Sequence, residues 1–207
     1  MEPLEIRLLL SATPVAPDLT TIANATNLEP NPITQAATPD QAVSFQLDYQ
    51  DTGTGTGTSG LGLRIHYNSQ QLKPGQAGAD AQFGTVDDIA VLTNLISTGA
   101  STIFNGIQDL ADTSNFDGNI NTDRFILVAW SDFAGAFPKG AAELLIANFT
   151  TTATFTGTTV NFSTSSRPIG RALNATPAQF TLQQQNVDTD LDGGLDEAKA
   201  FILRNWS

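Results

Sequence analysis

Apolar and polar side chains alternate along several short segments, and this period of two is typical of half-buried β-strands. Residues 43–49 read VSFQLDY, and residues 61–67 repeat the pattern as LGLRIHY. Residues 125–130 are apolar throughout, which predicts a central strand covered on both faces. Further strands are expected at 144–149, 155–162 and 180–182. Because turns rich in Gly, Pro, Asn and Asp separate these segments, the pattern favours a β-sandwich over a parallel α/β fold.

Two segments have helical spacing instead. In 86–96, Ile89, Leu92 and Ile96 fall on one face, and Asp87 and Asp88 lie where the positive end of a helix would be. The second segment, 196–206, carries an apolar stripe that is expected to pack on the sandwich or on a partner. Its members are Ala198, Phe201, Ile202 and Trp206. The Gly- and Thr-rich segment 51–60 (DTGTGTGTSG) predicts a flexible loop between two strands.

The N-terminal segment is a further strand candidate. Leu4, Ile6, Leu8 and Leu10 alternate with other residues, and the following stretch, 11–40, holds five prolines. We therefore divide the chain into an N-terminal strand with a Pro-rich linker (1–40), a sandwich (41–183) and a C-terminal unit (184–207). The first strand either pairs with the last strand of its own sandwich or enters a neighbouring molecule and completes its sheet. We favour the first alternative because closing a long loop costs little entropy.

The chain carries 21 acidic and 9 basic residues, a formal charge of −12. Nucleic acid is a poor partner for such a chain, because phosphate contacts need clustered Lys and Arg. There is no Cys, which excludes disulfides and thiolate metal sites. No apolar run reaches the length of a membrane span and no signal peptide is visible, so membrane insertion is not expected. Together with the calcium motif below, these features favour an extracellular or cell-surface protein.

The C-terminal stretch 188–197, DTDLDGGLDE, has the spacing of a calcium loop. Alternating carboxylates can converge on one cation, and a glycine at the sixth position permits the sharp turn. The twelfth position of a full EF-hand would hold Glu but here is Lys199, so Glu197 closes a shortened loop. The alternative is an acidic, solvated helix N-terminus. The predicted Ca²⁺ ligands, with Gly194 acting through its carbonyl, are Asp188, Asp190, Asp192, Gly194, Asp196 and Glu197.

A second group of oxygen donors lies between residues 112 and 123. Carboxylate and amide side chains recur there at alternate positions, with Gly118 allowing a turn, and such spacing suits a second Ca²⁺ site. The alternative is an Asx-rich loop whose side chains bond to their own backbone. The candidate ligands are Asp112, Asn115, Asp117, Asn119, Asn121 and Asp123.

Four stretches in the middle of the chain carry a resemblance: LGLRIHYNSQQLKP (61–74), DTSNFDGNINTDRFILVAWSDFAGAFP (112–138), LLIANFTTTATFTGTTVNFSTSS (144–166) and LNATPAQFTL (173–182). Together they resemble the cohesin-like domains of bacterial surface proteins. It implies an all-β, nine-stranded jelly-roll sandwich, here with a short internal helix and a C-terminal calcium loop plus helix. Relatives of this kind bind other proteins through a sheet face, often dockerins. The terminal loop resembles the abbreviated calcium loops of dockerin and excalibur motifs, but a single loop is half of a dockerin pair.

These features predict a non-catalytic protein. The single histidine, His66, is expected at an outward position of a strand, at the surface, and one histidine leaves Ser–His and His₂–metal arrangements short of parts. Our first hypothesis is a secreted, calcium-binding module for protein–protein interaction or adhesion. The second is a calcium-stabilised fibre or tube subunit that joins copies of itself by donating its N-terminal strand. The third is carbohydrate binding on a sandwich face.

Overall fold

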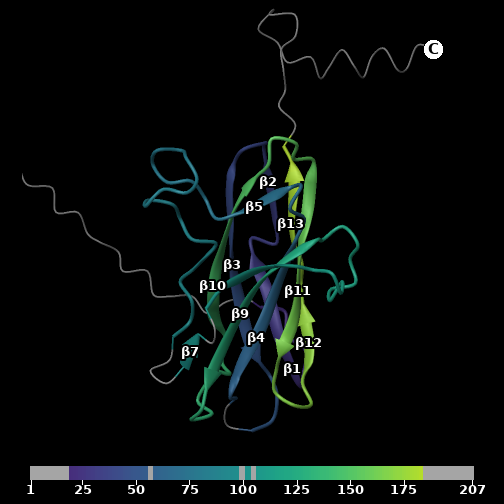
Figure 1. Cartoon of the computed structure of the whole chain (residues 1–207). Coiled ribbons are helices and arrows are strands. Elements are labelled where there is room, and N and C mark those ends of the chain that lie inside the picture. Colours follow the sequence, from purple (N-terminus) through teal and green to yellow (C-terminus); the bar gives the residue numbers. More distant parts are fainter. Residues whose placement is uncertain (1–18, 56–57, 98–100, 104–105, 184–207) are drawn as a thin grey trace, which may run out of the picture.

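The computed structural model describes residues 19–55, 58–97, 101–103 and 106–183. These residues form two β-sheets that face each other across one hydrophobic core (Figure 1). Every regular element of the described residues is a strand. A helix of the length and apolarity needed to cross a membrane is accordingly missing from the described part of the chain.

The first sheet contains the two long strands that include the predicted segments 43–49 and 144–149, and these two strands pair with each other. Its order is β12-β1-β3-β10-β5, and β6 also pairs with β10. β1 runs parallel to β12, whereas the other pairs are antiparallel. The bounds are β1 Ala25–Asn31, β3 Ala42–Asp51, β5 Leu72–Pro74, β6 Leu92–Thr93, β10 Ala142–Thr151 and β12 Ala172–Ala175.

The second sheet has the order β2-β13-β11-β4-β9-β7, and β8 also pairs with β9. β2 runs parallel to β13, and the remaining pairs are antiparallel. The bounds are β2 Thr34–Ala37, β4 Gly60–Tyr67, β7 Ser101–Ile103, β8 Gln108–Ala111, β9 Arg124–Asp132, β11 Gly157–Ser166 and β13 Ala178–Leu182.

Aromatic side chains fill the space between the sheets. The ring of Phe45 on β3 contacts Phe149 of its own sheet and reaches Phe162 and Phe180 of the opposite sheet, at centroid distances of 6.0–6.5 Å. All four side chains are buried. Since each aromatic ring removes a large apolar area from water, this cluster stabilises the contact between the two sheets.

The structure confirms the all-β sandwich predicted from the alternation. The predicted segments 43–49, 61–67, 125–130 and 144–149 lie inside β3, β4, β9 and β10. The segment 51–60 connects β3 to β4, as expected. The sequence predicts that the strand at 125–130 is covered on both faces. In the structure, Leu127 and Ala129 on the outward face of β9 are only half-buried.

The predicted helix 86–96 is wrong. Val86 is fully exposed, Ile89 is largely exposed, and Leu92 belongs to the short strand β6. Asp87 and Asp88 are not helix N-terminal acids, since Asp87 accepts a hydrogen bond from the Thr85 hydroxyl and Asp88 accepts one from the Gly84 amide within a loop. The apolar residues at helical spacing belong to different local structures, since Ile89 lies in a loop and Leu92 lies in β6.

The predicted Pro-rich connection 11–40 is also wrong over part of its length, because β1 and β2 lie inside it. β1 pairs with β3 and β12, and β2 pairs with β13, so this stretch belongs to the sandwich. The predicted strand at 4–10 and the C-terminal loop and helix at 188–206 lie outside the described residues.

Candidate functional site

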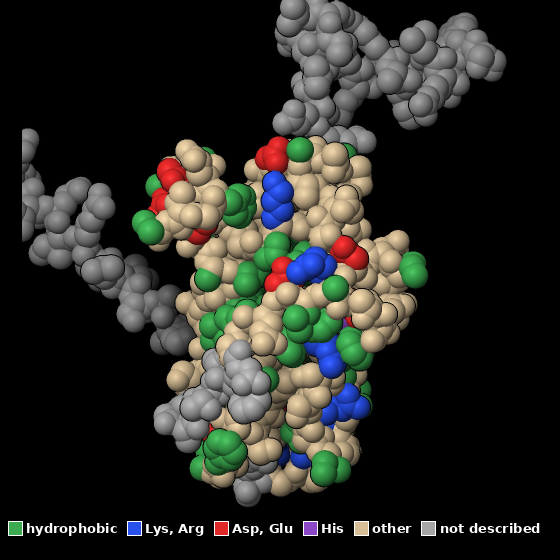
Figure 2. Space-filling view, viewed as in Figure 1, with side chains coloured by type: hydrophobic (Ala, Val, Ile, Leu, Met, Phe, Trp, Pro, Cys, Tyr) green, Lys and Arg blue, Asp and Glu red, His purple; other side chains and the backbone are tan. Residues whose placement is uncertain are grey.

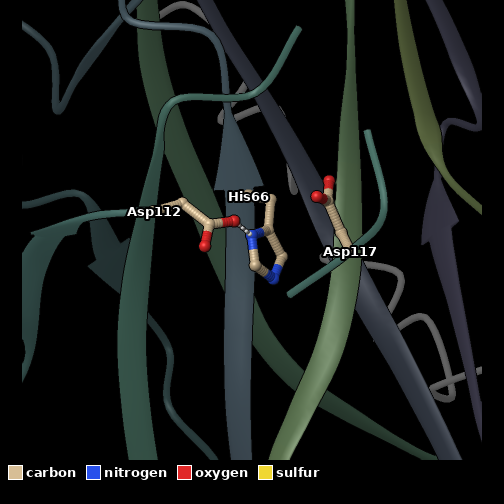
Figure 3. A group of neighbouring side chains, drawn as sticks. All are labelled: His66, Asp112 and Asp117. Carbon is tan, nitrogen blue, oxygen red and sulfur yellow. Dashed lines mark hydrogen bonds and ion pairs between the residues drawn. The ribbon is translucent and has the colours of Figure 1, made fainter. Parts of the chain in front are cut away.

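His66 is not the surface histidine that its strand position predicts. Its side chain leaves the outward face of β4 but is completely buried, because the segment that follows β8 lies over this part of the sheet. Figure 3 shows His66 between Asp112 on one side and Asp117 on the other. The two aspartates lie five residues apart in the chain, so the segment brackets the imidazole ring.

Both ring nitrogens of His66 have partners. Nδ1 lies 2.8 Å from Oδ2 of Asp112, and Nε2 lies 2.7 Å from the Ser163 hydroxyl on β11. The ring also packs against Phe125, with 5.4 Å between the ring centroids. Burial lowers the pKa of His66, outweighing the opposite effect of the nearby carboxylates of Asp117 and Asp112. The imidazole is therefore neutral at pH 7 and holds β4, β11 and the covering segment together.

Asp117 binds the other side of the same segment to β11. Its Oδ2 accepts hydrogen bonds from Asn161 Nδ2 at 2.9 Å and from the Thr122 hydroxyl at 2.8 Å, and its Oδ1 accepts one from the Asn119 amide. Burial alone would raise the pKa of Asp117, but these hydrogen bonds hold it below its ordinary value. Asp117 is consequently an ionised anchor of the segment at neutral pH.

The structure divides the six candidate ligands of 112–123 into four groups. Asp112 and Asp117 come together with His66, and one ligand atom from each lies within 4.8 Å of the others. Asn119 and Asn121 line a polar hollow near the start of β11. Asp123 turns to Ser69, accepting hydrogen bonds from its amide and hydroxyl.

Asn115, the remaining candidate, is exposed and has a positive φ of 48°, as expected of a turn. Its amide donates to the Asp112 carbonyl, and Gly118 donates to the Asn115 carbonyl. The segment therefore has the hydrogen bonds of an Asx-rich loop, while Asp112, Asp117 and His66 offer a mixed oxygen and nitrogen donor set. Imidazole and carboxylate together suit transition metals as well as harder cations.

Ser163, His66 and Asp112 form a hydrogen-bonded series that the sequence analysis missed. The order is that of a nucleophile, a base and a residue that orients the base. No sequence motif joins these residues, since they lie on two strands and a loop and meet only through the register of β4 and β11. Because the imidazole is fully buried, the series ties the loop to the sheet.

A second feature of this sheet is a hollow of about 690 Å³ at the opposite end of β4 and β9. Small residues, Gly62 and Ala129, form part of its lining, with Phe133 and Arg167 beside them. Phe133 is 94% exposed. Figure 2 shows this side of the molecule, where hydrophobic side chains gather over the middle of the sheet and Lys and Arg side chains lie beside them.

Arg64 connects the two features, because it lies on β4 between Gly62 and His66. Its guanidinium carbon is 4.0 Å from the ring centroid of Phe116, and its Nη1 donates to the Thr164 carbonyl. A cation stacked on an aromatic ring is held in place while part of both groups stays in contact with solvent. Phe116 is half exposed, so the pair presents an apolar surface with a positive charge.

No protein-family model matches the chain, and no curated protein sequence matches it. Solved structures with a similar fold include cohesins. The seventh ScaB type I cohesin from Pseudobacteroides cellulosolvens matches with a TM-score of 0.44 and 8% identity, covering 76% of this chain and 93% of that one. CaCohA2 from Clostridium acetobutylicum matches with a TM-score of 0.42 and 11% identity, over 77% of this chain and 90% of its own. A non-cellulosomal cohesin from the archaeon Archaeoglobus fulgidus matches with a TM-score of 0.42 and 11% identity, over 78% and 93% of the two chains.

Proposed function

We propose that this protein is a non-catalytic, extracellular or cell-surface module that binds a protein partner through the outward face of β4, β9 and β11. The observation that carries the proposal is the hollow beside Phe133. An aromatic side chain that is 94% exposed loses the stabilisation that burial would give it, and it lies next to an apolar depression. A protruding ring beside a concave floor is a surface that a partner side chain can fill.

The charges of this face indicate the chemistry of the partner. Arg64 lies on β4 and Arg167 directly follows β11, although the chain as a whole has a formal charge of −12. A partner segment with an apolar anchor for the hollow and acidic residues beside it would complement this surface. Arginine and aromatic residues are also the side chains that dominate the binding energy of protein interfaces.

The experiment is a selection of displayed peptides on the intact chain and, in parallel, on Phe133→Ser and Ala129→Leu. The first variant removes the exposed ring and the second fills the floor of the hollow. We expect the intact chain to enrich peptides with an apolar residue flanked by Asp or Glu, and both variants to lose this enrichment.

The matched control is Val86→Ser, which removes an equally exposed apolar side chain from the loop between β5 and β6. It should select the same peptides as the parent chain. Equal enrichment on the parent and on Phe133→Ser would contradict the proposed face. If sedimentation shows dimers or polymers of the parent that Phe133→Ser abolishes, the occupant of this face is a second copy of the chain.

We also propose that the module binds Ca²⁺ at the C-terminal loop and in the segment 112–123. The first proposal rests on the spacing of Asp188, Asp190 and Asp192, and the second on the approach of Asp112 to Asp117. Titration calorimetry with CaCl₂ on the full chain tests both. Asp190→Ala should abolish one binding event and Asp117→Asn the other, whereas the exposed Asp40→Asn should abolish neither. Unchanged heats in either site variant would refute that site.

A further inference from the structure

A polar hollow lies at the end of the second sheet, and the segment 112–123 forms part of its lining. Three parts of the chain that are distant in sequence form it: the turn after β4, the end of the segment before β9, and the start of β11. Its volume is about 310 Å³, at the lower end of the range for small-molecule pockets. The lining residues are Asn68, Gln71, Asn119, Asn121, Thr122, Thr156, Gly157, Thr158 and Thr159.

The lining carries amides and hydroxyls and no formal charge. Gly157 has a positive φ of 111°, and an added Cβ there would meet the Phe180 carbonyl at 3.2 Å. The backbone at the start of β11 therefore requires glycine, because a side chain there would press on the neighbouring strand β13.

Three of the amide side chains are held by their oxygen atoms. Gln71 Oε1 accepts a hydrogen bond from the Thr156 amide at 2.7 Å, and Asn68 Oδ1 accepts one from the Gln70 amide at 2.8 Å. Asn119 Oδ1 accepts one from the Asn121 amide at 3.1 Å. In each case the NH₂ group makes no hydrogen bond to the described residues. The hydrogen-bonded oxygen orients the side chain and leaves two N–H donors for a ligand.

Further polar groups of the hollow are also without protein partners. The side-chain amide of Asn121 and the hydroxyls of Thr158 and Thr159 make no hydrogen bonds among the described residues. The hollow thus offers donors and acceptors together, in a lining with little apolar surface. Such a lining gains little from burying an apolar side chain, and hydrogen bonds would supply most of its affinity.

The charge around the hollow decides between an anionic ligand and a neutral polar ligand. The amide donors alone would suit an anion, but the carboxylates of Asp117 and Asp123 flank the lining residues 119–122 and the chain is strongly acidic. A sugar hydroxyl both donates and accepts, carries no charge, and several hydroxyls fit in a compact volume. We propose that this hollow binds one unit of a neutral carbohydrate, through the side-chain amides of Asn68, Gln71, Asn119 and Asn121. This site goes beyond the proposed protein-binding face and does not depend on it.

The test is a titration of the ¹⁵N-labelled full chain with methyl glucoside, methyl galactoside, methyl mannoside and N-acetylglucosamine, followed through the side-chain amide signals in ¹H–¹⁵N spectra. We expect at least one sugar to shift the NH₂ signals of Asn68, Gln71 and Asn119 with saturation in the millimolar range. Asn121→Ala and Gln71→Glu should each weaken binding about fivefold, the factor that one net hydrogen bond contributes. Gln71→Glu keeps the oxygen that accepts from Thr156, so it removes the donor without releasing the turn.

The control Gln82→Ala removes an exposed amide from the loop between β5 and β6 and should bind like the parent. Phe133→Ser should also bind sugar like the parent, so failure of one site is distinguished from failure of the other. The proposal is overturned if no sugar shifts these signals, or if Asn121→Ala and Gln71→Glu both bind as the parent does. It is equally overturned if inorganic phosphate or a blocked dipeptide shifts these signals and the sugars do not.

Discussion

His66 and Asp112 share a hydrogen bond of 2.8 Å although neither side chain has any contact with solvent. The pair joins the strand β4 to the segment that covers it, so the stability of this contact depends on the protonation state of the imidazole. Its environment and those of three other charged groups lead to specific predictions.

The free energy of unfolding should fall as the pH is lowered below about 6.5, the ordinary pKa of histidine. The pKa of His66 is lowered in the folded chain, so the unfolded chain binds a proton first and acidification favours unfolding. Urea unfolding between pH 8 and pH 5 measures this dependence. His66→Gln should be less stable at pH 8 but should lose less stability over the same interval. Parallel curves for the parent and the variant would contradict the assignment.

Asp117→Ala should lower the free energy of unfolding by about 1–3 kcal/mol at pH 7, the cost of removing a charged acceptor from partly buried donors. Asn161, Thr122 and the Asn119 amide would lose their common partner. Chemical denaturation measures the loss, with Ser114→Ala as the control, because Ser114 is an exposed residue of the same segment. If both variants unfold at the same denaturant concentration, Asp117 does not anchor the segment.

Arg171→Ala should destabilise the chain by about 3 kcal/mol, because it leaves a buried carboxylate without its cation. Arg171 Nε lies 3.0 Å from Asp51 Oδ1, and the Asp51 side chain is fully buried. The comparison is Arg124→Ala, whose partner Asp109 is about one third exposed, and this change should cost less than about 1 kcal/mol. Equal losses in thermal unfolding would show that burial does not set the strength of these two pairs.

Asp48→Asn should stabilise the chain at pH 7. Glu29 and Glu143 lie directly opposite Asp48 on β1 and β10, and Asp48 is only 4% exposed. Burial, reinforced by these two carboxylates, raises the pKa of Asp48, so stability is lost as the pH rises through that value. The gain should be up to about 1 kcal/mol, as for other like-charge pairs across strands. Asp40→Asn, an exposed isosteric change, should leave the unfolding midpoint unchanged, and no gain in Asp48→Asn would contradict the prediction.

The strands were predictable from sequence where one face is buried and the other is exposed to solvent. In β3, for example, Val43, Phe45 and Leu47 are buried and the residues between them are partly exposed. The outward face of β4 was not predictable in the same way. The burial of His66 depends on a segment nearly 50 residues further along the chain, and periodicity within a strand carries no information about what covers it.

For the candidate site, the sequence predicted which residue types the segment 112–123 contains but not which partners they contact. The Asx-rich character of 112–123 is visible in the sequence, but its division between His66, Ser69 and the polar hollow follows from the register of distant strands. β1 was missed because Pro30 and Pro32 suggested a linker. Pro30 nevertheless lies within β1, opposite Leu47 of β3 and beyond the residues of β1 that pair with β12.

The parallel pairing of β1 with β12 and of β2 with β13 has a mechanical consequence. β1 lies beside β12 in the first sheet and β2 lies beside β13 in the second, and the two strands of each pair point the same way. A tension applied between the two ends of the sandwich would slide these strands lengthwise past each other and strain their hydrogen bonds simultaneously. If two antiparallel neighbours were pulled apart from one end, their hydrogen bonds would instead break one after another. The sandwich is therefore arranged to resist stretching along its strands, which is the load that a tether between two anchored bodies experiences.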